Sequence, residues 1–272
     1  MKGTTLFFIA LVIGLLVASG CVSSPTSTVP APTTPVPQEG RPHYVIGVDG
    51  DYPPFTYRDS GSNFTGFDIE AARWIADREG FDVEFVAVPW GEILPVLQKG
   101  TIDMIYSGIA ITPERQKYAN FTTSYLTVNG SIAIRQGSTI TAQDLYAGRL
   151  RIGAQEKTTE ADWVRENLVQ SGKMPASNLV LYPDISQLTE SLANGTIDAS
   201  IIDAPVQKRA VTGKSLTIIG EIPTMARYAV AVRKTDPQLL TTMDNGLRQL
   251  MNDPYWQQLE EKYGLVREPG AP

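Results

Sequence analysis

Cysteine and histidine are almost absent from this sequence of 272 residues, which holds one of each, Cys21 and His43. A single cysteine excludes an internal disulfide framework and any Cys-rich zinc site. A single histidine excludes an all-histidine metal centre. We therefore expect neither a metal nor another cofactor.

Basic residues are also in short supply. The chain has 23 Lys and Arg against 29 Asp and Glu, which gives a formal net charge of −6. A nucleic-acid binder needs a basic face to neutralise phosphates, so we expect no nucleic-acid partner. Hydrophobic residues make up 42% of the chain. That fraction is enough to build one large domain or two lobes of about 100 residues each.

The apolar run at the N-terminus is short and covers residues 6–17. A helix of that length is too short to span the hydrocarbon core of a bilayer, which is roughly 30 Å thick. A basic Lys2 before it and small residues after it are typical of a secretory signal. The end of the segment resembles a lipobox, in which Cys21 becomes the lipidated first residue of the mature protein. We expect a signal peptide over 1–20 and an extracytoplasmic protein anchored to the cell membrane through Cys21, with an uncleaved anchor as the alternative.

Residues 22–41 contain five prolines, seven Ser or Thr and no aromatic residue. Such a composition cannot bury a core and favours extended, polyproline-like conformations. We expect residues 21–41 to form a tether and residues 267–272 to form a disordered tail.

From residue 44 the sequence alternates short β-rich runs with amphipathic segments. Strands are predicted at 44–48, 82–87 and 104–106, separated by helices within 66–80 and 90–98. This β-α-β-α-β order predicts a mostly parallel sheet in an α/β fold.

The same pattern then starts again. A second series of strands is expected at 131–135, 151–154, 178–182 and 199–202, with helices at 159–169 and 185–193. A strand at 228–232 and helices at 237–251 and 254–263 complete the chain. Two similar units in one chain indicate two lobes, which we place at 42–127 plus 226–266 and at 128–225.

An internal echo supports the two-lobe interpretation. The sequence LQKGTID at 97–103 recurs as LANGTID at 192–198. Each copy has the pattern of a helix end, a glycine cap and a turn into an apolar strand. Ligands of open α/β sheets sit outside the carboxyl ends of the strands, so the segments 49–55, 107–115 and 154–159, together with Asp203, are the candidates for a site.

These segments carry a resemblance to a known family. The sequence GFDIE at 66–70, followed by a helix, resembles the signature of the polar-amino-acid family of ABC-importer solute-binding proteins. The likeness continues through 107–115, the Thr158–Thr159 turn, Asp203 and 228–234. It implies a two-lobed fold of the type II periplasmic-binding-protein kind, with a hinge and a central ligand cleft.

The resemblance implies a role for each candidate side chain. Arg115 would hold the α-carboxylate of an amino acid through its guanidinium fork. Gly108 and Ala110 would offer backbone N–H groups to the same carboxylate. Thr159 would add a donor from the second lobe, and Asp203 would pair with the α-ammonium. The alternatives are a surface arginine at 115 and a helix N-cap at 203.

The remaining candidates concern the side chain of the ligand. Tyr52 and Trp90 would form aromatic walls, although a Trp at this position is also compatible with a core residue. The resemblance implies that the position of Asp49 faces the ligand side chain, and an acid there suits a basic or amide-bearing group. Ser107 and Gln155 are expected to supply further polar contacts.

The resemblance implies a monomeric receptor that binds a free amino acid by hinge closure and delivers it to an ABC permease and its ATPase. We expect the hinge crossings near 126–130 and 222–227. Two alternatives stay open. One is an enzyme of the cyclohexadienyl or arogenate dehydratase kind on the same fold, which we do not favour because the clamp offers no obvious proton relay. The other is a lipoprotein that presents its ligand to a separate sensor.

Overall fold

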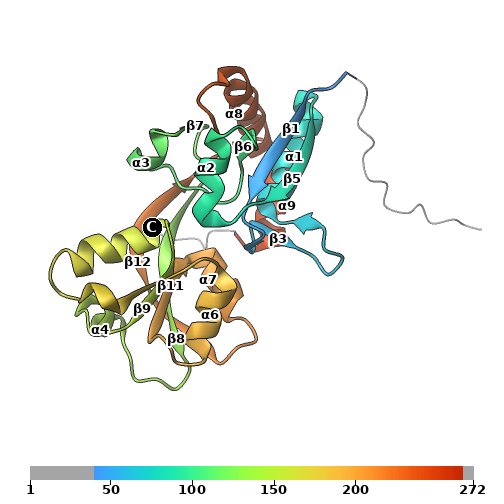
Figure 1. Ribbon diagram of the computed structural model, residues 1–272. Helices are drawn as coiled ribbons and strands as arrows, with labels where there is room; N and C mark the ends of the chain where they lie inside the picture. Colours follow the sequence, from blue (N-terminus) through green and yellow to red (C-terminus); the bar gives the residue numbers. More distant parts are fainter. Residues whose placement is uncertain (1–39, 266–272) are drawn as a thin grey trace, which may run out of the picture. The chain divides into compact units, whose positions relative to one another are not determined.

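The computed structural model describes residues 40–265, and Figure 1 labels most of their helices and strands. The predicted signal peptide, Cys21, nearly all of the tether and the tail at 267–272 lie outside the described residues. Within the described range, no helix is both long enough and apolar enough to cross a membrane.

The first sheet has five strands in the order β5-β1-β6-β13-β7. Their bounds are Asp82–Ala87, His43–Val48, Met104–Ile105, Ala231–Arg233 and Ala119–Phe121. β1 runs parallel to β5 and β6, as predicted, whereas β13 runs antiparallel to β6 and β7. The sheet is therefore mixed, and the prediction of a mostly parallel sheet was wrong at this edge.

Helices pack against both faces of the first sheet. On one side α1 (Phe67–Glu79) lies against α8 (Pro237–Met251) and α9 (Pro254–Tyr263). On the other side lies α2 (Ile93–Gln98), which follows the short 3-10 turn η1 (Trp90–Glu92). Successive side chains of a strand point to opposite faces, so Met104 joins the core under α1 while Ile105 joins the core under α2.

The second sheet has the order β10-β9-β11-β8-β12. Its strands are Leu179–Tyr182, Ile152–Gln155, Ala199–Asp203, Leu126–Arg135 and Leu216–Tyr228. β9 runs parallel to β10 and β11, and β8 runs antiparallel to β11 and β12, so this sheet is mixed as well.

Helices flank this sheet on two sides as they do the first one. The core of one face joins α4 (Ala142–Tyr146) with α5 (Thr159–Val164), which continues as the π-turn η2 (Arg165–Val169). The other face is packed by α6 (Ile185–Ala193) and α7 (Ala204–Val211). A 3-10 turn, η3 (Ala176–Asn178), leads into β10. The two mixed sheets with their helices confirm the predicted α/β class.

The long strands β8 and β12 connect the two sheets. They pair from Leu216 opposite Arg135 to Tyr228 opposite Leu126, with two irregularities in register. At its end β12 also reaches the first part of the chain, where Tyr228 forms an antiparallel bridge with Ala110. The predicted crossings at 126–130 and 222–227 lie on these two strands. The prediction of a single strand at 228–232 was wrong, because β12 ends at Tyr228 and β13 begins at Ala231.

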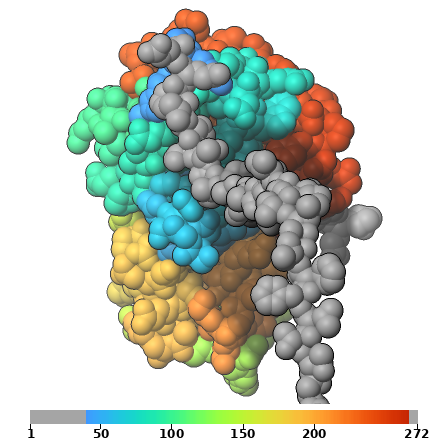
Figure 2. Space-filling model, turned by 90° about the vertical axis from the view of Figure 1, so that its right-hand side faces the viewer, coloured from blue at the N-terminus to red at the C-terminus, as the bar shows by residue number. Residues whose placement is uncertain are grey.

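A small sheet next to the site was not predicted. It consists of β2 (Asp51–Tyr52), β3 (Thr56–Arg58) and β4 (Phe64–Thr65). The Ser186 N–H, at the start of α6, donates to Asp51 Oδ2 at 2.9 Å, which joins this sheet to the second part of the chain. In Figure 2 the light-blue surface of this region adjoins the yellow surface of the later segment.

The sequence echo corresponds to two equivalent corners of the structure. Gly100 and Gly195 follow α2 and α6 with φ angles of 77° and 84°. Asp103 then accepts a hydrogen bond from Val45 N at 2.7 Å, and Asp198 accepts one from Arg151 N at 2.8 Å. In both corners a carboxylate accepts a backbone N–H from the segment that forms the neighbouring strand, so the two copies have the same structural role.

Candidate ligand-binding site

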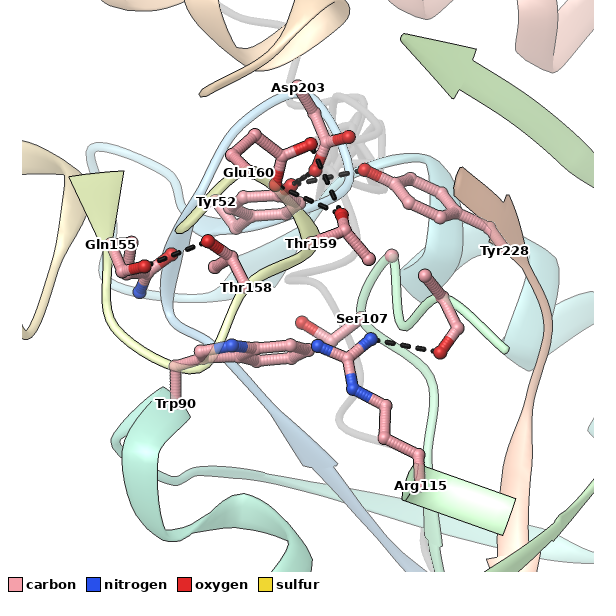
Figure 3. Close-up of a pocket in the computed structure, with 12 residues that line it drawn as sticks. Tyr52, Trp90, Ser107, Arg115, Gln155, Thr158, Thr159, Glu160, Asp203 and Tyr228 are labelled. Atoms are coloured by element: carbon pink, nitrogen blue, oxygen red, sulfur yellow. Dashed lines mark hydrogen bonds between the residues drawn. The ribbon is translucent and has the colours of Figure 1, made fainter. Parts of the chain in front are cut away.

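A cavity lies where the ends of these strands meet, and Figure 3 shows its lining. The lining residues come from segments far apart in the sequence: Tyr52, Trp90, Ser107, Gly108, Ala110, Arg115, Gln155, Thr158, Thr159, Glu160, Asp203 and Tyr228. All the predicted site residues except Asp49 belong to this lining. The free room within it is about 10 Å³, about what a single water molecule needs, so the lining side chains lie close to one another.

The guanidinium of Arg115 enters the cavity from α3 (Pro113–Gln116). Thr112 caps this short helix by accepting a hydrogen bond from Arg115 N at 3.1 Å, which fixes the backbone from which the side chain starts. Nη1 donates to Ala110 O and Nη2 donates to Lys157 O, both at 2.9 Å. The guanidinium also lies 5.3 Å from the centre of the Trp90 ring. Its donors thus bind carbonyl oxygens in this structure, and they are placed to bind a carboxylate instead.

Asp203 ends β11 and faces the same cavity. The Tyr52 hydroxyl donates to Asp203 Oδ2, and the Tyr52 and Tyr228 hydroxyl oxygens are 3.1 Å apart. Asp203 Oδ1 is buried and accepts no hydrogen bond from an N–H or hydroxyl group of the described residues. Burial raises the pKa of Asp203, while the hydroxyls of Tyr228 and Tyr52 lower it.

Glu160 lies beside Asp203 and is 2% exposed. It is the second residue of α5, whose N-terminus is capped by the Thr158 hydroxyl. The Thr159 hydroxyl donates to Glu160 at 3.1–3.2 Å, so this hydroxyl points to a carboxylate within the protein. Burial raises the pKa of Glu160 well above its ordinary value, and the neighbouring Asp203 raises it further.

Asp49 lies behind Gln155, outside the cavity lining. Gln155 Nε2 donates to Asp49 Oδ2 at 3.0 Å, and Gln155 itself lines the cavity. The Asp49 N–H donates to Ser107 Oγ at 2.9 Å. Burial raises the pKa of Asp49, while the hydrogen bonds from Gln155 and from the N–H of Asp51 lower it. In this structure the carboxylate reaches the cavity only through the Gln155 amide.

The two backbone donors predicted for the ligand carboxylate differ in their surroundings. Gly108 N donates at 2.7 Å to Asp68 Oδ2, so this N–H is already paired. Ala110 faces Tyr228 in an antiparallel bridge whose hydrogen bonds are made by Ile111 N and Ala229 N. The Ala110 N–H therefore points away from that bridge.

Lys157 adopts the left-handed conformation that a glycine would adopt more easily, with φ of 57°. Its carbonyl accepts hydrogen bonds from Arg115 and, at 3.3 Å, from Trp90 Nε1. Its ammonium donates to the Gly91 carbonyl. The loop after β9 is thus held against η1 and α3 from the opposite part of the chain.

Three lining residues were not predicted as site residues: Thr158, Glu160 and Tyr228. Thr158 lay within the candidate segment 154–159 but was given no role, and Glu160 is the residue that follows this segment. For Tyr228 the signal was weaker, because its strand was expected to begin there rather than end there. Among residues 40–265, no three His, Cys, Asp or Glu side chains are arranged to hold a metal ion.

Comparison with known proteins assigns this arrangement to a family. Residues 44–266 match the family described as "Bacterial extracellular solute-binding proteins, family 3". The L-cystine-binding protein TcyJ of Escherichia coli (strain K12) is 28% identical over 225 residues, which cover 80% of this chain and 81% of that protein. The ABC transporter arginine-binding protein 1 of the same organism is 27% identical over 224 residues, covering 80% and 89%.

A solved structure of an ancestral arginine-binding protein bound to arginine is similar in fold. It is 28% identical, covers 82% of this chain and 98% of that chain, and superposes with a TM-score of 0.75. The likeness confirms the predicted fold of the type II periplasmic-binding-protein kind.

Proposed function

Because the chain belongs to family 3 of the bacterial extracellular solute-binding proteins, we propose that it is the extracytoplasmic receptor of an ABC importer for a free amino acid. Relatives whose names state arginine or cystine binding, one of them in an ABC transporter, support this proposal. The family consists of binding proteins, so the protein is not an enzyme and the dehydratase-like alternative is not retained.

The observation that carries the proposal is the pair of opposite charges in the cavity. Arg115 lies on α3, between two strands of the first sheet, and Asp203 is the last residue of β11 in the second sheet. Both are buried and line the same small cavity. A buried charge is costly unless a partner satisfies it. An amino acid brings both partners at once, with its carboxylate for the guanidinium and its ammonium for Asp203 Oδ1, which lacks a donor.

For the ligand side chain we propose a basic or amide-bearing group. Tyr52 and Trp90 supply aromatic surface, and an aromatic face attracts a cation. The Gln155 amide has both a donor and an acceptor, and it is backed by the Asp49 carboxylate. A cationic group that displaces Gln155 from Asp49 would gain a charge-assisted hydrogen bond, whereas an amide ligand would pair with Gln155 itself.

Hinge closure is the proposed mechanism, with lobe 1 at 42–127 plus 226–266 and lobe 2 at 128–225. β8 and β12 are the connecting strands at which the two would rotate. The hydrogen bonds of Arg115 and Trp90 to the Lys157 carbonyl join residues of the two proposed lobes across the cavity. We further propose that the protein is a monomer, anchored at the membrane through a lipid on Cys21, and that its permease recognises the closed form.

A thermal-shift screen tests the proposal. The purified protein is unfolded in guanidinium, refolded to remove carried ligand, and heated with each of the twenty amino acids, ornithine or citrulline. A ligand at 100 times its dissociation constant adds about 2.7 kcal/mol of stability. For a domain of this size that corresponds to roughly 5–10 °C in the unfolding midpoint. A screen in which no amino acid raises the midpoint would show that the proposal is wrong.

A further inference from the structure

Glu160 and Asp203 place two carboxyl groups side by side at one end of the cavity (Figure 3). Both residues are at most 5% exposed. The two groups are within hydrogen-bonding reach of each other, provided that one of them carries a proton. Asp203 Oδ1 is buried, and no donor among the described residues bonds to it.

The groups around the pair do not neutralise two negative charges. Arg115 is the cation that faces it, but its two outer nitrogens donate to the carbonyls of Ala110 and Lys157 rather than to a carboxylate. Tyr52, Tyr228 and Thr159 contribute neutral hydroxyls. On the side of β8 the Glu160 stem packs against Gly130, which has no charge to offer. Asp162, which follows on the same helix, is exposed and pairs with Arg165, so neither of these charges is added to the buried pair.

We propose that Glu160 and Asp203 share one proton in the ligand-free protein and exchange it for the ammonium group of the bound amino acid. The inference rests on the proposed function, because it takes the ligand to be an α-amino acid. Two buried carboxylates with no cation between them do not both ionise, and one retains a proton.

The proton and the ammonium are alternative occupants of the same place. Both are positive and would be held by the carboxyl groups of Asp203 and Glu160, and the cavity is too small to separate the two sites. Binding therefore follows a balanced step: the protonated pair takes up the ammonium form of the ligand and releases one proton to solvent.

One released proton per bound ligand makes the affinity rise with pH. The dissociation constant falls by up to tenfold for each pH unit while the free pair holds its proton. Glu160→Gln mimics the protonated pair, because its amide donates to Asp203 at every pH. The variant is expected to bind as the wild type does at low pH and to gain no affinity as the pH rises.

Titration calorimetry with L-arginine and L-glutamine as probes tests the exchange between pH 5.5 and 8.5. Each titration is run in two buffers with different ionisation enthalpies, so that released protons are counted. The wild type should release close to one proton, and Glu160→Gln should release fewer and bind at least tenfold more weakly at pH 8.5. Glu166→Gln, an exposed acid on η2, is the matched control and should follow the wild type. Equal proton release in the wild type and Glu160→Gln would overturn the exchange.

A measurement without ligand separates this inference from the proposed function. A shared proton raises the pKa of the pair above the unfolded values, so the wild type must lose stability as the pH rises through it. Glu160→Gln lacks that loss. Its unfolding midpoint should therefore rise relative to that of the wild type between pH 5 and pH 8.5. Parallel midpoints would refute the shared proton even if amino acids bind. A relative rise in the midpoint of Glu160→Gln without any amino-acid binding would support the shared proton. The same result would refute the proposed function and, with it, the exchange.

Discussion

Asp68 offers the sharpest test of how burial of a carboxyl group makes the stability of this protein depend on pH. It lies on α1 with no exposed surface, and it accepts hydrogen bonds from Gly108 N at 2.7 Å and from the Tyr125 hydroxyl at 2.9 Å. Burial raises its pKa from 3.8 to about 7, although these hydrogen bonds lower it. A pKa raised in the folded state means that the stability it brings is complete at low pH and is lost as the pH rises towards 7.

The magnitude follows from the size of that shift. About three pKa units at about 1.4 kcal/mol each amount to roughly 4 kcal/mol of stability lost between pH 4 and pH 8. Asp68→Asn removes this dependence because the amide does not ionise. The variant has its own cost. Its amide oxygen can still accept from Gly108 and Tyr125 at the position of Oδ2, but a buried NH2 group takes the place of the acceptor Oδ1, and a buried N–H without a partner costs about 1–3 kcal/mol.

The two effects have opposite signs, so the stability curves should cross. At pH 4.5 the Asp68→Asn variant should unfold several degrees below the wild type. At pH 8 it should equal or exceed the wild type, a total relative change on the order of 10 °C. Differential scanning calorimetry of the ligand-free proteins at half-unit pH steps measures this. Curves that stay parallel from pH 4.5 to 8 would refute the assignment of a raised pKa to Asp68.

Three further substitutions test the binding site and the backbone around it. Arg115→Lys keeps the charge but loses the planar fork, and calorimetric titration should show at least a tenfold weaker affinity, because a charge-assisted hydrogen bond contributes about 1.5–3 kcal/mol. Gly66→Ala places a Cβ 2.1 Å from a backbone oxygen at a φ of 127°, and we expect a loss of at least about 2 kcal/mol in chemical denaturation. Lys157→Gly relieves the left-handed backbone but removes the contact of the Lys157 ammonium across the cavity. The rate constant for ligand dissociation, measured by stopped-flow fluorescence, should rise about fivefold, and the free energy of unfolding should stay within about 1 kcal/mol of the wild type.

Each substitution has a matched control. Arg149→Lys changes an exposed arginine and should leave affinity unaltered. Gly220→Ala adds a Cβ whose nearest neighbour is 3.5 Å away, so its stability should stay near that of the wild type. Lys157→Ala also removes the ammonium but keeps the strained backbone, and it should release ligand as fast as Lys157→Gly while being less stable. Equal behaviour of Gly66→Ala and Gly220→Ala would contradict the steric argument.

The sequence predicted the regular part of the fold because apolar spacing is a local signal. β5 and the helices α6, α8 and α9 have the predicted bounds, and β1 and α1 differ from the prediction by one or two residues. β12 was missed over most of its length, since Gly220 and Pro223 interrupt its apolar pattern and its pairing with β8 shifts register twice. The antiparallel edges follow from long-range pairing, which no local pattern encodes.

The candidate site was predictable to the extent that strand ends determine it. The carboxyl ends of β6, β9 and β11 bring Ser107, Gln155 and Asp203 to one cavity, as the rule for open α/β sheets requires. The same rule does not give the direction of a side chain. Asp49 follows β1 in the expected place, yet its carboxylate lies behind Gln155 because the hydrogen bond from Gln155 and its own N–H bond to Ser107 hold it there.

Charge is where the sequence is least informative, because a formal charge says nothing about its neighbours in space. Asp68, Glu160 and Asp203 count as three equal negative charges in the composition. In the fold all three are buried, and burial is the largest cause of the rise in each of their pKa values. Asp68 is stabilised by hydrogen bonds from within its own part of the chain, whereas no donor among residues 40–265 bonds to Oδ1 of Asp203. The same physical cause thus accompanies a support beneath the Gly108 loop in one place and, in the other, the carboxyl pair that we propose as the site for a ligand ammonium. The difference lies in which donors the fold brings near.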